Sequence, residues 1–350
     1  MTAMDLVIGM LIAIGTAIAG ALGTVGVSSV VRARQMRREP LREAARQAVI
    51  VALCGEGSMT GEALTRLGQL PRRDVARVLL DLAPSVNGTS RQVLLSLGED
   101  SGLLRRAHKG VRHRRWATRL YSARVLTAFG VDSEDMWLLL RDRSPEVRAQ
   151  AAAWATIAPS PSTIQRLITL LSDGNGLCRF TAQDALIRIG LGGSDALISA
   201  LETANDDLKE KILIIAAATG DERFYGPAAQ LAWDQSPRTR QLAAAVLAST
   251  GRSNAGQILV ILLDDPSNAV VLAALVGLAK LSYWPAAATV ERLLHHASWE
   301  LRHQAGVTLM ALGAPGIVML RATARDEGPA AEMAERVLQL QALAIGSEAA

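Results

Sequence analysis

The chain has 350 residues, of which 50% are hydrophobic but only 3% are aromatic, so its apolar content is mainly Ala, Leu, Val and Ile. This composition favours closely packed helices over a β-sandwich, in which aromatic and β-branched residues are more frequent. The two cysteines, Cys54 and Cys178, are too few for a disulfide framework or a structural zinc site. We expect both to be small buried residues in a reducing compartment.

The net charge of +4 hides an asymmetry along the chain. Residues 32–119 carry 18 Lys and Arg against 8 Asp and Glu, whereas residues 120–350 carry 19 against 24. The basic half directly follows a hydrophobic N-terminal segment. An anionic membrane surface would attract positive charge at that place.

Residues 6–31 read LVIGMLIAIGTAIAGALGTVGVSSVV and contain no charged side chain. As a helix this segment would reach roughly 39 Å, which exceeds the roughly 30 Å of a bilayer's hydrocarbon core. The sequence therefore predicts a transmembrane helix. A cleaved signal peptide is the alternative, but MTAMD at the start lacks the expected positive charge, and the apolar run is longer than a signal peptide needs.

Arg32, Arg34, Arg37 and Arg38 follow this segment directly. The positive-inside rule then predicts a single-pass protein of the bacterial inner (cytoplasmic) membrane. Its N-terminus would face out, and everything after residue 31 would lie in the cytoplasm.

Small residues recur within the predicted span, at Gly9, Ala13, Ala17 and Gly20. Small side chains let another helix approach closely, so this face could pack against a membrane partner or a second copy of the chain. The alternative interpretation is the general richness of membrane helices in Gly and Ala.

Residues 32–110 show helical apolar spacing over 41–54, 72–82 and 90–97, separated by Pro and Gly. The block is interpreted as a basic helical adaptor or as degenerate repeats. At its end lies a dense basic cluster that predicts a surface for an anionic partner: Arg105, Arg106, Lys109, Arg112, Arg114, Arg115 and Arg119.

Within that interpretation, an anionic lipid surface or an acidic protein ranks above nucleic acid, because few aromatic side chains accompany the charges for base stacking. His108, His113 and Trp116 lie among the basic residues. The alternative is a solvated charged face with no ligand.

From residue 111 a pattern recurs about every 31 residues. In this pattern a Gly recurs at the end of a helix, where the left-handed C-cap conformation is needed. Ser takes its place once. These positions are Gly130, Gly190, Gly220, Gly251, Ser282 and Gly313. Buried Ala residues between these positions would let neighbouring helices pack tightly. Residues 111–345 are therefore predicted to form an α-solenoid of antiparallel helix pairs, because one pair alone cannot bury its apolar face.

A polar residue is predicted to open one helix of each unit, since such side chains cap free amide groups. These residues are Asp142, Asp173, Asn205, Asp234, Asp265, His296 and Asp326. Six residues after the first six of them stand Arg148, Arg179, Lys211, Arg240, Val271 and Arg302. We expect the basic ones to bind carboxylates or helix carbonyls of the neighbouring unit; an acidic partner is the alternative. A last helix over 330–343 and a disordered tail would end the array.

The stretches DRSPEVRAQAAAWA (142–155), DQSPRTRQLAAAVLASTG (234–251) and ASWELRHQAGVTLMALG (297–313) resemble bacterial HEAT-like repeats of the phycobilisome-lyase type. The resemblance covers about residues 111–345 and implies an α-solenoid. Proteins of this kind are mostly scaffolds, and a few bind DNA or chromophore proteins. Together with the predicted anchor, the chain resembles membrane-anchored HEAT-repeat proteins associated with envelope and polysaccharide-synthesis machinery.

No catalytic or metal-binding motif stands out. His295, His296 and His303 lack a Cys or carboxylate at ligand spacing, and GLGG at 190–193 has no strand before it. We therefore expect no enzyme activity, no metal and no cofactor.

The predicted function is that of a membrane-anchored scaffold or adaptor whose cytoplasmic solenoid binds a protein partner. An accessory subunit of envelope or polysaccharide-synthesis machinery is the specific form that the resemblance implies. One alternative is a protein that binds nucleic acid or another anionic ligand through residues 105–119. The other is an enzyme or enzyme subunit of unrecognised type.

Overall fold

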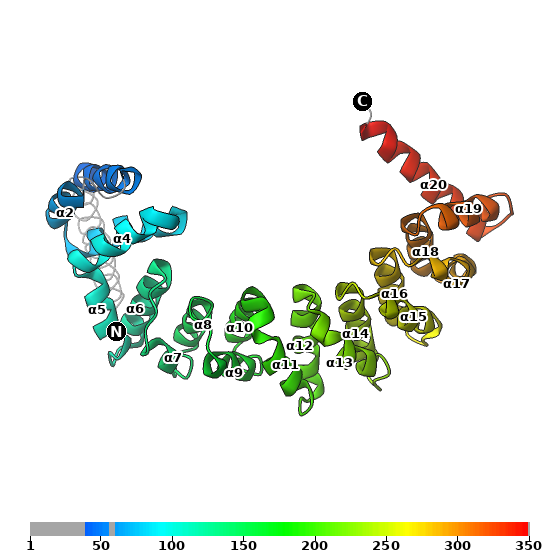
Figure 1. Ribbon diagram of the computed structural model, residues 1–350, viewed down its shortest axis with the longest axis horizontal. Coiled ribbons are helices and arrows are strands. Elements are labelled where there is room, and N and C mark those ends of the chain that lie inside the picture. The colour runs from blue at the N-terminus through cyan, green and yellow to red at the C-terminus, as the bar shows by residue number, and fades with distance from the viewer. Residues whose placement is uncertain (1–38, 56–59, 349–350) are drawn as a thin grey trace, which may run out of the picture. The chain divides into compact units, whose positions relative to one another are not determined.

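The computed structural model describes residues 39–55 and 60–348, with side chains as far as residue 340 (Figure 1). Within these residues the secondary structure is entirely helical. The chain divides into two compact units, Met1–Asp135 and Met136–Ala350, which are called unit 1 and unit 2 below and are described separately. The predicted all-α class is confirmed for this part of the chain.

The described residues of unit 1 form a helix over residues 39–54 and five further helices. These are α2 (Thr60–Gly68), α3 (Arg72–Leu82), α4 (Gly88–Asp100), α5 (Leu103–Val111) and α6 (Trp116–Phe129). All three helices predicted in this region are present, and α3 has the predicted bounds. The Ser90 hydroxyl donates to the Leu53 carbonyl at 2.8 Å and so ties α4 to the end of the first helix.

Unit 2 is built from short helices joined by tight turns and single-turn 3-10 segments. They are α7 (Met136–Leu139), α8 (Pro145–Trp154), α9 (Pro161–Leu170), α10 (Gly176–Ile189), α11 (Ser194–Leu201), α12 (Asp206–Thr219), α13 (Tyr225–Leu231), α14 (Pro237–Ser249), α15 (Ser253–Ile261), α16 (Asn268–Lys280), α17 (Ala287–Arg292), α18 (Trp299–Ala311), α19 (Ala314–Thr323) and α20 (Pro329–Glu348). Helices α8 to α18 with even numbers form one row, and the odd-numbered helices form a second row beside it (Figure 1). Unit 2 is therefore an α-solenoid, as predicted.

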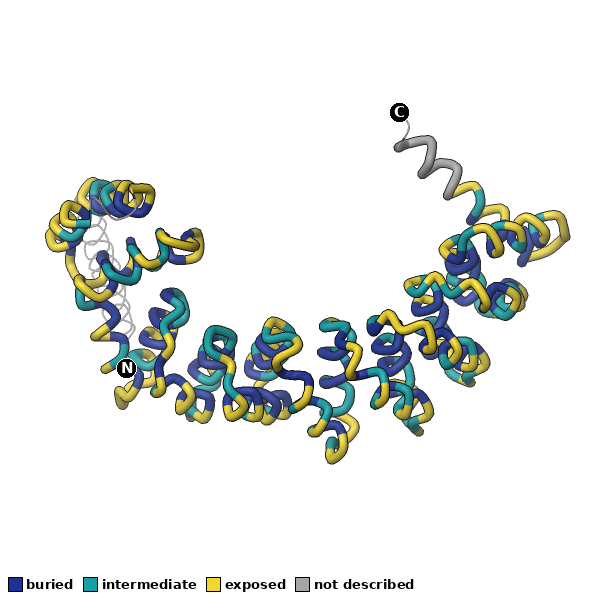
Figure 2. The backbone as a smooth tube through the Cα atoms, in the orientation of Figure 1, coloured by how far each residue is buried: buried dark blue, intermediate teal, exposed yellow. Residues whose placement is uncertain are grey.

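The core of unit 2 lies between these two rows, where buried turns face each other (Figure 2). The alanines expected to allow close packing are all fully buried: Ala151, Ala152, Ala182, Ala243, Ala244, Ala274 and Ala305. Their small side chains bring helices of the even-numbered row close together. The Thr308 hydroxyl of α18, also fully buried, donates to the Leu275 carbonyl of α16 at 3.1 Å.

The predicted helix-ending positions all have positive φ, although the ψ angles of Gly190 and Gly313, −131° and −147°, lie outside the left-handed helical region. The φ angles are 62° at Gly130, 62° at Gly190, 65° at Gly220, 68° at Gly251, 48° at Ser282 and 77° at Gly313. Ser282 is the one residue other than Gly with positive φ in the described part of the chain. The spacing read from the sequence therefore located these six turns, including the one where Gly is missing, but not the turn between α8 and α9.

Two expectations need correction. Cys178 is buried, but Cys54 is exposed. The helix over 39–54 turns Ala45, Val49 and Leu53 inward, so the residue after Leu53 faces away from the core. At the other end of the chain, α20 continues to Glu348, beyond the predicted end at residue 343.

No helix among the described residues is both long and apolar enough to span a membrane. The predicted span over residues 6–31, with Gly9, Ala13, Ala17 and Gly20, lies outside the described residues. The transmembrane anchor and its packing face therefore stay predictions.

Replacing Ser282 by Gly should raise the free energy of unfolding by about 0.5–1 kcal/mol, because Gly adopts positive φ without steric cost. The matched change Gly220→Ala should lower it by about 1–2 kcal/mol. The new Cβ would carry a φ of 65° and lie 3.1 Å from the Ser249 carbonyl oxygen. Urea denaturation measures both changes, and a loss of stability in Ser282→Gly would contradict the assignment.

Candidate functional site

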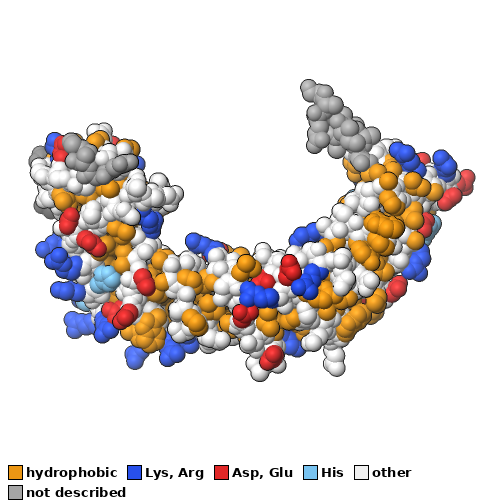
Figure 3. Space-filling view, in the orientation of Figure 1, with side chains coloured by type: hydrophobic (Ala, Val, Ile, Leu, Met, Phe, Trp, Pro, Cys, Tyr) orange, Lys and Arg blue, Asp and Glu red, His pale blue; other side chains and the backbone are white. Residues whose placement is uncertain are grey.

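The predicted basic surface lies on α5, on the loop after it and on the start of α6. Helix α5 buries Leu103, Leu104 and Ala107, so its basic side chains project away from the core. The residues Arg105, Arg106, Lys109, Arg112, Arg114 and Arg115 are exposed, and Arg119 is half-buried. Figure 3 shows Lys and Arg side chains gathered over this end of unit 1.

Three of these side chains have partners within the chain. The Arg112 Nε atom donates to Asp135 at 3.0 Å, and Arg106 donates to the Ser101 carbonyl at 3.3 Å. The Arg119 guanidinium donates to the carbonyls of His113 and Arg114 at 2.9 and 3.0 Å. The cations at Arg105, Lys109, Arg114 and Arg115 make no ion pair within the described residues. These four are the ones that unit 1 leaves available to an anionic partner.

A groove that the sequence analysis did not anticipate lies beside this surface. Helices α3, α5 and α6 enclose about 630 Å³ above an apolar floor of Ala76, Leu80, Leu103 and Ala107. Tyr121 of α6 lines the groove, with 44% of the residue exposed. Partial burial raises the pKa of the Tyr121 phenol, and the nearby Arg106 charge opposes this rise.

Four arginines line the groove, namely Arg72, Arg73, Arg77 and Arg106, against a single carboxylate, Asp81. None of the three arginines on α3 makes an ion pair within the described residues. The other acid of α3, Asp74, is buried and pairs instead with Arg42 at 3.0 Å between Nε and Oδ1. The signal in the sequence was RRDVAR, in which Arg73 and Arg77 are four residues apart and therefore share one face of the helix.

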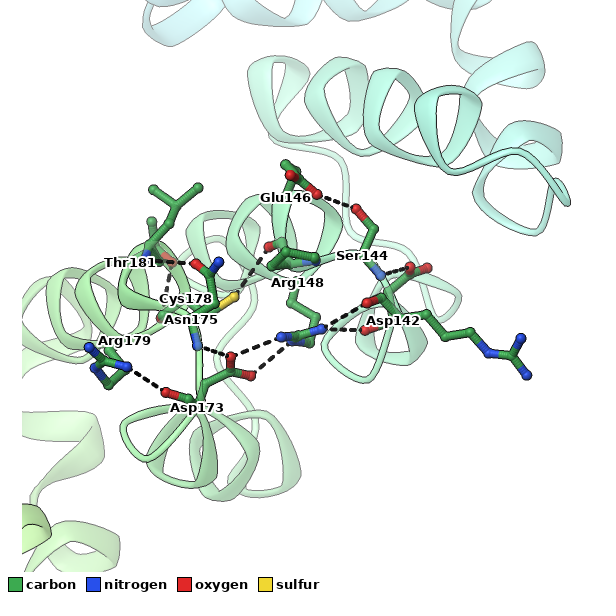
Figure 4. A network of polar contacts seen from close by, with 12 residues as sticks. Asp142, Ser144, Glu146, Arg148, Asp173, Asn175, Cys178, Arg179 and Thr181 are labelled. Atoms are coloured by element: carbon green, nitrogen blue, oxygen red, sulfur yellow. Dashed lines mark hydrogen bonds and ion pairs between the residues drawn. The ribbon is translucent and has the colours of Figure 1, made fainter.

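The basic row of unit 2 has a different role, which Arg148 illustrates (Figure 4). Its Nε and Nη2 atoms donate to both carboxylate oxygens of Asp173 in the next repeat, at 2.9 and 2.8 Å. Its Nη1 atom donates to the Asp142 carbonyl at 2.8 Å. Asp173 in turn accepts from the Asn175 amide at 2.9 Å. One guanidinium therefore joins two consecutive repeats.

The same arrangement recurs at Arg240, which donates to Asp265 at 2.7 and 2.8 Å and to the Asp234 carbonyl at 2.9 Å. The side chains of this pair are only 13% and 6% exposed. The hydrogen bonds from Arg240 lower the pKa of Asp265, against partial burial, which raises it. The expectation that these arginines bind the neighbouring unit is confirmed at both positions.

The register assigned to the third unit was wrong by two residues. Asn205 is the N-cap itself, because its side chain accepts from the Leu208 amide at 3.0 Å. Lys209 therefore occupies the place given to Lys211, and its Nζ atom lies 3.5 Å from Asp234. Thr203 stands where the units of α8, α10, α14 and α16 have Asp, so Arg179 has no carboxylate to bind there.

Arg119 belongs to the same series, one unit earlier, which the sequence analysis missed. The His113 ring accepts from the Arg115 amide at 3.1 Å, just as His296 accepts from the Ser298 amide at 3.0 Å. The repeat pattern therefore already begins within unit 1. Of the other histidines considered, His303 stacks on Trp299 with ring centroids 5.1 Å apart.

A second type of bridge joins α11 to the turn before α13. The Arg223 Nη1 atom lies 2.7 Å from Asp195, and its Nη2 atom donates to the Leu191 carbonyl at 2.6 Å. Its hydrogen bonds to Asp221 lower the pKa of that carboxyl to about 2. The Asp221 side chain is buried, and it also accepts from the Arg223 backbone amide at 3.0 Å.

No family model matches the chain, and no curated protein matches it. Among solved structures, importin beta is 10% identical, with a TM-score of 0.50 over 82% of this chain and 50% of its own. An engineered protein is 18% identical, and the match covers 85% of this chain and 94% of the engineered one, with a TM-score of 0.39. The CpcE–CpcF complex of phycocyanin lyase from Nostoc sp. PCC7120 is 18% identical over 67% and 93%, with a TM-score of 0.32.

The chain thus spans half the length of importin beta, and the likeness concerns the fold. It supports the assignment of the chain as an α-solenoid of HEAT-like repeats.

Replacing Arg240 by Met should lower the free energy of unfolding by about 2–3 kcal/mol, because Asp265 would be left as a half-buried charge without its partner. The matched change Arg179→Met removes the equivalent side chain where no carboxylate is bound, and should cost less than about 1 kcal/mol. Urea denaturation measures both. Equal losses would show that the bridge to the next repeat contributes nothing.

Replacing Asp221 by Asn should destabilise the protein most at neutral pH. Because the folded pKa of Asp221 is lowered to about 2, its contribution is present above the unfolded pKa of about 3.9 and is lost as the pH falls towards 2. The difference in free energy of unfolding between wild type and variant should shrink over that range. Asp195→Asn, an exposed partner of the same arginine, is the control; a pH-independent difference for Asp221→Asn would contradict the assignment.

Proposed function

We propose that the protein is a non-enzymatic scaffold whose α-solenoid binds a protein partner. One observation carries the proposal: unit 1 presents an apolar groove beside a basic surface on which Arg105, Lys109, Arg114 and Arg115 make no ion pair among the described residues. In unit 2, by contrast, Arg148, Arg240 and Arg223 are bound within the repeat stack. An apolar surface with unpaired charges beside it is suited to bind a partner protein, because interfaces combine an apolar centre with a polar rim.

Exposed aromatic side chains in unit 2 support the same proposal. Each exposes between 47% and 69% of its surface: Trp137, Phe180, Trp233, Trp284 and Trp299. Aromatic residues are enriched at protein interfaces, where they give large contact areas at low entropic cost. A stack of repeats offers an extended surface on which several such contacts can be made.

We further propose that residues 6–31 hold this scaffold at the inner membrane of a bacterium, with the N-terminus out and the solenoid in the cytoplasm. The uncharged run and the arginines after it support this topology. Gly9, Ala13, Ala17 and Gly20 would pack against a membrane partner or a second copy. In this setting the protein would act as an accessory subunit of envelope or polysaccharide-synthesis machinery.

A second candidate is an anionic-ligand or nucleic-acid binder. It is favoured by the clustering of the free cations at Arg105, Lys109, Arg114 and Arg115. It requires binding of nucleic acid that weakens steeply as salt rises. Absence of such binding at low salt would leave the protein-binding function as the better explanation.

Affinity purification of the tagged full-length chain from detergent-extracted native membranes should recover one reproducible protein in stoichiometric amount. The control is a chain that lacks residues 1–31, which should move from the membrane fraction to the supernatant. Recovery of the chain alone in repeated preparations would contradict the scaffold. Equal membrane association of both chains would contradict the anchor but leave the scaffold standing.

A further inference from the structure

The groove of unit 1 combines an apolar floor with a basic rim. Its floor is apolar and its rim carries Arg72, Arg73, Arg77 and Arg106, all exposed. None of the four makes an ion pair within the described residues, and the one acid of the lining is Asp81. A guanidinium is suited to bidentate binding of carboxylates, so this rim matches an acidic surface.

The arrangement follows from the way in which α3 packs. Asp74 points into unit 1 and is neutralised by Arg42, whereas the arginines on either side of it point outwards. The acidic side chain Asp74 therefore lies in the core, and the arginines of α3 line the groove. Arg73 and Arg77 lie one helical turn apart, on the same face.

The shape of the groove favours a peptide over a single acyl chain. Its rim is formed by exposed side chains of three helices, so it is open along α3 rather than closed around a tail. The stretch of α3 from Arg72 to Leu80 is about 12 Å long, or roughly two helical turns. An amphipathic helix lays residues spaced i, i+3, i+4 and i+7 into a groove of this kind.

We propose that this groove is the docking site for an acidic amphipathic helix of the partner protein. Its apolar side chains would cover Leu80 and Tyr121, which line the groove and are accessible, and its Asp or Glu residues would bind the four arginines. The proposal rests on the scaffold function proposed above, since that function supplies the partner. It adds where the partner binds and what chemistry its binding segment has.

Asp81 gives the site a direction. It lies one turn after Arg77, at the end of α3. A carboxylate there repels acidic residues of the bound segment and favours a basic or neutral one. The bound helix should therefore carry its acidic residues towards the arginines and away from the Asp81 end.

The test is a selection of displayed random peptides of about 16 residues, or about four helical turns, on the full chain. The enriched peptides should be amphipathic and acidic. Binding of one such peptide is then measured by fluorescence anisotropy. The variant Arg73→Ala with Arg77→Ala should weaken its binding by about tenfold or more, and Glu→Gln changes in the peptide should do the same.

Two control variants separate the groove from general attraction. Arg105→Ala with Lys109→Ala removes two cations from the neighbouring basic surface but leaves the groove lining intact. It should change the affinity by less than about threefold. Asp81→Asn should strengthen binding of the acidic peptide. Unchanged melting temperatures confirm that the variants fold.

Several results would overturn the proposal. They are enriched peptides without acidic residues, equal losses from the two double variants, or binding of phosphatidylglycerol vesicles, rather than peptides, that depends on Arg73 and Arg77. If the variant Arg73→Ala with Arg77→Ala still copurifies its native partner in full amount, this docking site is wrong, although the scaffold function stands. If no partner is recovered with the wild type, the function itself fails.

Discussion

One interaction fixes the register between consecutive repeats, the bidentate bond between an arginine of one unit and the aspartate two residues before the capping residue of the next. At Arg148 and Asp173, and again at Arg240 and Asp265, it fixes both the guanidinium and the turn that starts the following helix. Apolar packing brings neighbouring helix pairs together but specifies register weakly. A planar guanidinium that donates to both carboxylate oxygens and to a carbonyl fixes the register more precisely, because all three hydrogen bonds require one geometry.

The exceptions to this interaction show how the array tolerates sequence change. Thr203 replaces the aspartate that Arg179 would bind, and Val271 replaces the arginine itself. The helices still stack at both places, because fully buried Ala182 and Ala274 keep the even-numbered row tightly packed. The bridge therefore adds specificity and stability to a stack that close packing makes possible.

In unit 1 several cations make no ion pair among the described residues. Arg119 still follows the repeat pattern by binding the His113 and Arg114 carbonyls. The arginines of α3 have no such partner, and they face an apolar groove instead of a neighbouring repeat. Arg148 and Arg240 of unit 2 bind carboxylates of the neighbouring repeat. The arginines of α3 in unit 1 make no such ion pair and are available to a partner. This contrast is the physical basis of the proposed function.

The sequence by itself determined the helical class, the 31-residue period and six of the turns with positive φ, including the one at Ser282, because these depend on local backbone sterics and capping. It also located the basic residues of α5. Only the tertiary structure decided which charges are free, that Lys209 rather than Lys211 faces the next repeat, and that Cys54 is exposed. The groove itself arises where α3, α5 and α6 meet. Ion pairing, exposure and the groove depend on contacts between residues distant in the chain. The periodicity of a single helix carries no information about such contacts.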